Sequence, residues 1–181
     1  SLGGTVLSES VRVAGDEIND SIATYLKKVH NLVVGERTAE EIKIKIGSAF
    51  PSNEFDLQSI DVRGLHLLSG LPRSINLKAG DLREAMSEPL NKIVDAVKRT
   101  LERTPPELAA DIVDRGIMLA GGGALVRGIS DLLSHETGIF THVAEDPLLC
   151  VVNGCGLVLD DFKSMRRVLD TPDFARNVIR D

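Results

Sequence analysis

The chain has 181 residues, enough for one domain with a full core or for two small lobes. Its net charge is −6 and its Lys and Arg residues are dispersed, which argues against sequence-independent nucleic-acid binding because that needs a basic face. No stretch approaches the roughly 20 unbroken apolar residues of a membrane span. With no Trp and one Tyr, the core must be aliphatic.

The N-terminal segment has the pattern of extended strands. Val6, Val11 and Val13 are β-branched residues, which favour strands, so they predict a strand pair. The chain begins at Ser1 without an initiator Met, inside this pattern. We therefore expect it to be a piece of a longer protein.

Two helices are predicted next. Asp16 is expected to cap the first, whose apolar stripe includes Ile18 and Leu26. The second is predicted to start at a capping box made by Thr38 and Glu41. It should stop at Gly47.

Two charged side chains on the second helix form a possible binding face. Glu40 and Lys43 are three residues apart, so both project from one side of the helix. A carboxylate and an ammonium suit the vicinal hydroxyls of a sugar, because the first accepts hydrogen bonds and the second donates them. The alternative is a solvated ion pair worth a few tenths of a kcal/mol. Spacing alone leaves both open.

The stretch 48–80 predicts a small two-stranded sheet set apart from the main core, with strands near 57–62 and 75–77. Asp81 should cap a long helix, which Pro89 must kink or end. A short polar helix over 107–113 should then lead to a glycine-rich segment.

That segment, residues 117–128, is the most informative part of the chain. An apolar run ends in Gly121, Gly122 and Gly123, and an amphipathic helix is predicted directly after them. Glycines at such a junction let the backbone approach a flat ligand. No Gly-Lys-Ser/Thr follows, which excludes a Walker loop, and Val126 stands where the dinucleotide fingerprint needs Gly. A plain turn without a ligand is the alternative.

The last predicted elements are a strand over 139–143 and a helix. Asp146 and Pro147 should begin this helix. It is apolar nearly all round, which predicts that it is buried. Gly154 and Gly156 inside it suggest close approach of a neighbouring backbone.

The side chains that could carry catalysis or bind metal are dispersed. Cys150 and Cys155 lie too far apart along one helix for a disulfide, so we expect two small core residues. No histidine has a second ligand at helical spacing, which predicts no metal site. The four histidines are His30, His66, His135 and His142. No catalytic residue is expected in the chain.

The order of these elements resembles the actin-fold ATPases, and within them the MreB family of bacterial actin homologues. The resemblance extends nearly from the start of the chain to Asp161. The matching stretches are Ala14-Gly15-Asp16-Glu17, residues 35–40 and 46–48, residues 70–73, Thr104-Pro105-Pro106-Glu107-Leu108, residues 119–127 and Glu145-Asp146-Pro147-Leu148.

The resemblance implies an α/β fold, the second lobe of an actin-like (ribonuclease-H-like) ATPase with a small inserted α+β subdomain. The inner subdomain would comprise residues 1–30 and 94–163, and the outer one residues 31–93. Residues 164–181 would pack on a first lobe that the chain lacks. That lobe would hold the first phosphate loop, the catalytic carboxylate and the membrane-binding element, and the second phosphate loop would lie just before Ser1.

The resemblance also implies a nucleotide site. The capped helix would approach the ribose and adenine, and the glycine segment would form the adenine side with Gly121 shaping the turn. The residues implied are Glu40, Glu41, Ile42, Lys43, Gly121, Gly122, Gly123, Ala124 and Leu125.

The implied function is that of a cell-shape cytoskeletal protein of rod-shaped bacteria. It would bind ATP or ADP with Mg²⁺, hydrolyse ATP slowly and polymerise in the cytoplasm beneath the inner membrane. Its partners would be its own copies, a RodZ-type membrane-anchored protein and the cell-wall elongation machinery, with membrane contact only through the missing lobe. This chain alone should be inactive. The alternative is a lobe of a non-polymerising actin-fold ATPase, such as a DnaK-type chaperone or a sugar kinase.

Overall fold

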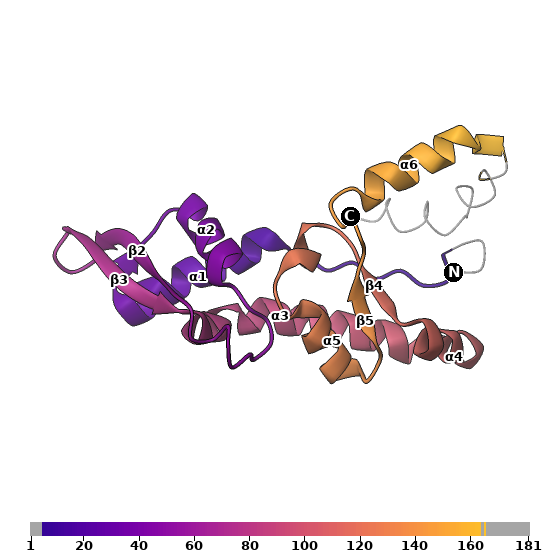
Figure 1. The fold of residues 1–181 in the computed structure, drawn as a ribbon, viewed down its shortest axis with the longest axis horizontal. Helices are drawn as coiled ribbons and strands as arrows, with labels where there is room; N and C mark the ends of the chain where they lie inside the picture. The colour runs from indigo at the N-terminus through magenta and orange to yellow at the C-terminus, as the bar shows by residue number, and fades with distance from the viewer. Residues whose placement is uncertain (1–4, 164, 166–181) are drawn as a thin grey trace, which may run out of the picture.

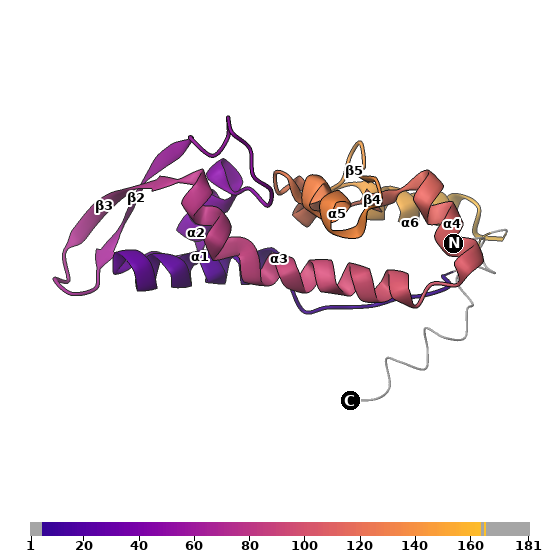
Figure 2. The ribbon, with the colours of Figure 1, turned by 90° about the horizontal axis from the view of Figure 1, so that it is seen from below.

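The structure is a computed structural model that describes residues 5–163 and 165. It is a mixed α/β fold, drawn out along the long helix α3 (Figures 1 and 2). The elements are α1 (Gly15–His30), β1 (Leu32–Val33), α2 (Glu36–Ile46), β2 (Ser59–His66), β3 (Pro72–Lys78), α3 (Ala79–Glu102), α4 (Pro106–Arg115), β4 (Ile117–Leu119), the 3₁₀ helix η1 (Gly122–Leu125), α5 (Ile129–Thr137), β5 (Thr141–Val143) and α6 (Cys150–Asp160).

One hydrophobic core joins α1, α2 and α3. The predicted stripe of α1 is confirmed, because Ile18, Ile22 and Leu26 are buried. Leu82 and Met86 of α3 belong to the same core. Each such side chain stabilises the fold by about 1.5–3 kcal/mol.

The N-terminal part of α1 differs from its prediction. The helix begins at Gly15 with Ala14 at its N-cap, so Asp16 lies in the first turn and does not cap it. The Glu17 carboxylate accepts a hydrogen bond from the Ala14 amide at 2.8 Å. This hydrogen bond holds the pKa of Glu17 below its ordinary value. The acidic first turn therefore stabilises the start of the helix.

The helices α2 and α3 also begin before their predicted caps. Since α2 starts at Glu36, Thr38 lies inside the helix and the predicted capping box is wrong. The helix α3 starts at Ala79, two residues before Asp81, and continues as one helix through Pro89. Packing overrides the proline here, because its side chain is buried with the apolar face of α3. The predicted subdomains 31–93 and 94–163 consequently share this helix.

The outer sheet has three strands in the order β1–β2–β3, where two were predicted. The strands β2 and β3 pair antiparallel from Ser59 opposite Lys78 to Leu65 opposite Pro72. The added strand β1 pairs antiparallel with β2. A two-residue strand is too short to show alternation in the sequence, which is why it was missed.

The predicted N-terminal strand pair is wrong within the described residues. Residues 5–14 form no strand, although they contain Val6, Val11 and Val13. The carboxylate of Glu9 holds this segment to α3, accepting a hydrogen bond from Arg99 Nε at 2.8 Å. β-branched residues favour strands only where a neighbouring strand pairs with them. Residues 1–4, 164 and 166–181, and the predictions made for them, lie outside the described structure.

The helix α6 contradicts the prediction that it is buried. It begins at Cys150, later than expected, and none of its residues is buried. Val151 and Leu159 are 73% and 74% exposed, and Figure 1 shows the helix standing apart from the rest of the fold. A methyl group on Gly154 or Gly156 would meet nothing within 4 Å, so the described residues make no close backbone approach there. Apolar residues all round a helix predict a partner without saying which segment supplies it.

The two cysteines are free, as predicted, but they are not core residues. Cys150 is half-buried and Cys155 is exposed. The Cys150 thiol donates a hydrogen bond to the Asp146 carbonyl at 3.2 Å. Neither cysteine is buried because both lie on α6, which has no buried residue.

Candidate functional site

The glycine turn joins the parallel strand β4 to α5 through η1. Gly121 has φ 83° and ψ 174°, a conformation that L side chains rarely adopt. Its amide donates to the Pro147 carbonyl at 2.7 Å, which fixes the turn to the loop before α6. The helix α5 starts only at Ile129, so a 3₁₀ turn separates it from the glycines.

Gly122 and Gly123 are open on the side where a Cβ would stand. A methyl group on Gly123 would meet nothing within 4 Å, and one on Gly122 only Leu148 Cδ2 at 3.6 Å. Neither glycine has a positive φ. Within the described residues, then, neither strain nor packing requires glycine at these positions. Surface of this kind admits a flat ligand to the backbone.

The two residues that follow the glycines differ in exposure. Ala124 is buried, whereas Leu125 is 56% exposed. An exposed leucine beside bare backbone offers an apolar contact to anything bound at the turn.

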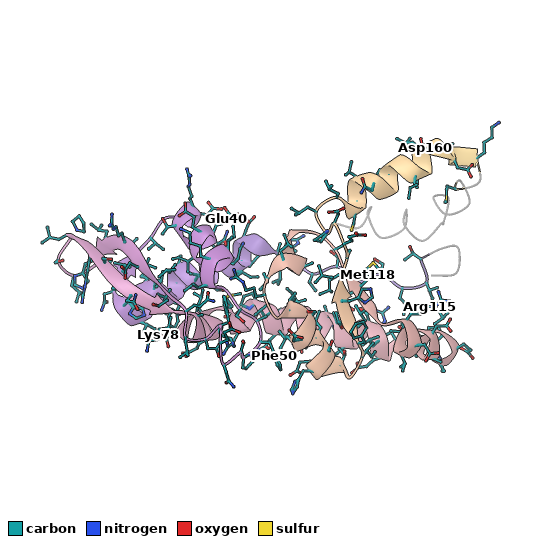
Figure 3. The ribbon with its side chains drawn as sticks, viewed as in Figure 1. Glu40, Phe50, Lys78, Arg115, Met118 and Asp160 are labelled. Carbon is teal, nitrogen blue, oxygen red and sulfur yellow. The ribbon has the colours of Figure 1, made fainter. Side chains whose placement is uncertain are left out.

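The second group of predicted residues lies on α2. Glu40 is exposed (Figure 3), and Lys43, one turn later, is half-buried. The Lys43 ammonium donates a hydrogen bond to the Gly15 carbonyl at 3.1 Å. A Cβ on Gly15 would come within 3.1 Å of that nitrogen, so the glycine leaves room for the lysine. The structure gives no ion pair between Glu40 and Lys43 among the described contacts.

The neighbouring residues on α2 point elsewhere. Ile42 is 2% exposed and belongs to the core, so its side chain is not available to a ligand. Glu41 lies between Arg37, at 3.4 Å, and Lys45, at 3.8 Å, in exposed pairs along the helix. Of the four predicted residues, Glu40 and Lys43 therefore share the candidate face.

Sequence reasoning missed Arg127, which ties α2 to the glycine turn. Its Nη1 donates to the Lys45 carbonyl at 2.8 Å. Its own carbonyl accepts a hydrogen bond from the Ala49 amide at 2.7 Å. No motif or periodicity singles out an exposed arginine after a turn, because its partners are backbone atoms about 80 residues away in the chain.

A cavity of about 300 Å³ lies against the glycine turn. Its lining is mainly apolar and includes Gly15 and Ile18 of α1 with Gly123 and Ala124 of the turn. Gly15, whose carbonyl accepts a hydrogen bond from Lys43, and the open Gly123 therefore border one space. A second cavity of about 370 Å³, lined by Thr5, α3 and α4, contains none of the predicted residues.

The described residues offer no metal site. No group of three or more His, Cys, Asp or Glu side chains among them is placed to hold an ion. In the same described part, no helix has the length and apolar character needed to cross a membrane.

Comparison with known proteins decides the family. The model of the MreB/Mbl protein family matches residues 1–167. The chain belongs to the MreB/Mbl family. It is 44% identical to the cell shape-determining protein Mbl of Bacillus subtilis (strain 168) over 91% of this chain and 49% of Mbl. It is 49% identical to the cell shape-determining protein MreB of Escherichia coli (strain K12) over 88% of this chain and 46% of that MreB.

Solved structures confirm the actin-like fold of this MreB/Mbl chain. MreB5 of Spiroplasma citri bound to AMPPNP has a TM-score of 0.85 at 35% identity, over 91% of this chain and 49% of that one. MreB5 bound to ADP gives 0.83 at 33% identity, over 92% and 49%. The MamK double helical filament, at 18% identity and a TM-score of 0.65, shares the fold alone. The chain spans about half the length of the curated relatives that it matches, and these relatives favour the cell-shape interpretation over a chaperone or a sugar kinase.

Proposed function

We propose that this chain supplies the adenosine side of an ATP-binding, filament-forming cell-shape protein. The observation that carries the proposal is the open backbone at Gly122 and Gly123, where no neighbour in the described chain requires glycine. The cavity that borders Gly123 also reaches Gly15, the partner of Lys43. A base and a sugar need such a combination of flat apolar space and a few polar groups.

Each residue would have a distinct role. Adenine would lie along Gly122 and Gly123, with Leu125 as an apolar contact and Gly121 shaping the turn. Glu40 would accept hydrogen bonds from the ribose hydroxyls, and Lys43 would donate to them. Ala124, Glu41 and Ile42 would support these positions without touching the ligand through their side chains.

The named relatives support a nucleotide ligand. The MreB5 structures contain AMPPNP and ADP, and they cover 91% and 92% of this chain. We propose residues 1–30 and 94–163 as the inner subdomain and 31–93 as the outer one, with ATP or ADP and Mg²⁺ bound by the protein at its full natural length. The metal ligands would come from outside the described residues.

Assembly is the second part of the proposal. The protein would polymerise with its own copies into filaments beneath the inner membrane, through membrane contacts outside this chain. A RodZ-type membrane-anchored protein and the cell-wall elongation machinery would be its partners. The support is family membership together with the names of the relatives, which are cell shape-determining proteins. This chain alone should not turn over ATP, because phosphoryl transfer needs phosphate and metal contacts.

Two measurements test the proposal. Calorimetry of the protein at its full natural length should give adenine-nucleotide binding that Gly123→Val weakens; binding unaffected by that substitution would contradict the site. Negative-stain microscopy with ATP should show filaments. Dispersed particles whose ATP turnover rises with a peptide or a sugar would favour the chaperone or kinase alternative instead.

A further inference from the structure

The C-terminal end of α2 is held by one side chain, that of Arg127. Its Nη1 donates to the carbonyls of Lys45, at 2.8 Å, and Ile44, at 3.3 Å. Both carbonyls lie in the last turn of α2, where intrahelical amides run out. A guanidinium there also opposes the negative end of the helix dipole. Arg127 therefore acts as a C-terminal cap supplied from outside the helix.

Two further contacts, one through its backbone and one through its guanidinium, hold the same residue. Its carbonyl accepts from the Ala49 amide at 2.7 Å, and its backbone forms a parallel bridge with Ser48. Its guanidinium carbon lies 4.4 Å from the centroid of the Phe55 ring. We call Arg127 with Ile44, Lys45, Ala49 and Phe55 the α2 latch.

The segment next to the latch is also closely packed. Gly128 has φ 71°, and a Cβ there would lie 2.9 Å from Phe50. The Phe50 ring lies 5.5 Å from the ring of His135 on α5, and Figure 3 places Phe50 at this junction. Phe50 is thus packed against Gly128 at the start of α5 and against His135 in its last turn.

The latch stands immediately beside both walls of the proposed adenosine site. Arg127 is two residues after Leu125, and the carbonyls that it binds belong to the two residues that follow Lys43. We propose that Arg127 is a positioning residue, which sets the separation between the glycine turn and the ligand-facing side of α2. The inference rests on the proposed function of that site. A site whose two walls are held in place before binding spends less binding energy on ordering them.

The positioning role can be separated from a role in stability. The Arg127 side chain is exposed, and its hydrogen bonds lie at the surface. Removing it leaves no buried charge unpaired, so the fold should change little in stability. Nucleotide affinity, which depends on the distance between the walls, should change more.

The test compares three variants with wild type at full natural length, measuring ATP affinity by calorimetry and the unfolding midpoint without nucleotide. Arg127→Ala should weaken ATP binding by about tenfold. Arg127→Lys should recover part of the loss, since an ammonium can still reach one carbonyl. Arg73→Ala, which removes an exposed arginine from β3, is the matched control and should bind as wild type.

The outcomes distinguish this inference from the proposed function. Suppose that wild type binds ATP, that Lys43→Ala binds it more weakly and that Arg127→Ala binds it normally. The positioning role of Arg127 is then wrong, and the proposed adenosine site is retained. A folded Arg127→Lys protein as weak as Arg127→Ala would also overturn that role. Loss of ATP binding by wild type itself would contradict the proposed function. Should Arg127→Ala fail to fold, Phe55→Leu decides: a smaller loss of affinity in the same direction supports the latch, and none overturns it.

Discussion

Glycines in this chain serve two different physical purposes, which the structure separates residue by residue. Gly128 has a positive φ and a close neighbour in Phe50, so only a residue without a Cβ fits there. Gly123 has neither, so its openness points to something outside the described chain. The sequence alone does not distinguish the two purposes, because both residues are simply glycines near residue 125.

Replacing these glycines should therefore give opposite results. Gly123→Val should leave the unfolding free energy within about 0.5 kcal/mol of wild type but weaken ATP binding at least about tenfold. Gly128→Val should lower the unfolding free energy by at least about 1 kcal/mol, because it forces a β-branched residue to a positive φ. Urea unfolding and calorimetry check both. Equal destabilisation by the two substitutions would show that Gly123 is a packing residue.

Lys43 offers a second test at this scale. In the protein at full natural length, Lys43→Ala should weaken ATP binding by about tenfold. The substitution removes the ammonium that donates to the Gly15 carbonyl and, in the proposed site, to the ribose. Lys45→Ala is the matched control and should bind ATP as wild type. It removes a side chain in an exposed pair with Glu41 and keeps the carbonyl that Arg127 binds. Unchanged affinity in Lys43→Ala would return Lys43 to a purely structural role.

At the scale of elements, the pattern of apolar residues predicted most helices and strands, while their ends depended on contacts that no local rule contains. The stripe of α1 and the strands β2 and β3 follow from periodicity. The cap of α2 does not, since Arg127 arrives from a distant part of the chain. The glycine turn and the face of Glu40 and Lys43 were predictable from residue type and spacing. The hydrogen bonds of Arg127 that join α2 to the turn were not.

The contact between α3 and α5 predicts a dependence on pH. Lys98 donates to the Glu136 carboxylate at 2.6 Å, and this hydrogen bond lowers the pKa of Glu136 from its ordinary value of 4.5. A lowered folded pKa gives stability that is present above the unfolded pKa and is lost as the pH falls through the folded one. Glu136→Gln should thus be less stable than wild type at about pH 6, and the difference should narrow at about pH 2.5.

Urea titrations at the two pH values measure this difference. Glu145→Gln, exposed in the loop between β5 and α6, is the control and should run parallel to wild type at both. A difference between Glu136→Gln and wild type that persists unchanged in acid would show that the contact acts through packing rather than charge.

At the scale of the whole molecule, the exposure of α6 is the largest departure from the sequence prediction. The apolar composition predicted that this helix is buried, whereas none of its residues is buried within the described part of the chain. The chain spans about half the length of its curated relatives. An exposed apolar surface of this kind promotes association and dye binding.

The double substitution Val151→Lys and Leu159→Lys tests the exposure of α6 directly. In the 181-residue chain it should leave the unfolding free energy nearly unchanged and reduce binding of an apolar fluorescent dye, because both side chains are largely in solvent. Ser130→Lys on α5 provides a control for added charge. A large loss of stability in the double variant would mean that these residues are buried in solution.

The most direct test of the central claim is photolabelling with 8-azido-ATP, followed by tryptic digestion and mass spectrometry. Cleavage after Arg115 and Arg127 releases the glycine turn as the single peptide 116–127, and cleavage after Arg37 and Lys43 releases 38–43 from α2. Label is expected to concentrate in these two peptides and to disappear when excess ATP is present. Label elsewhere in the chain, or label in these peptides that ATP does not displace, would contradict an adenosine site between the glycine turn and α2.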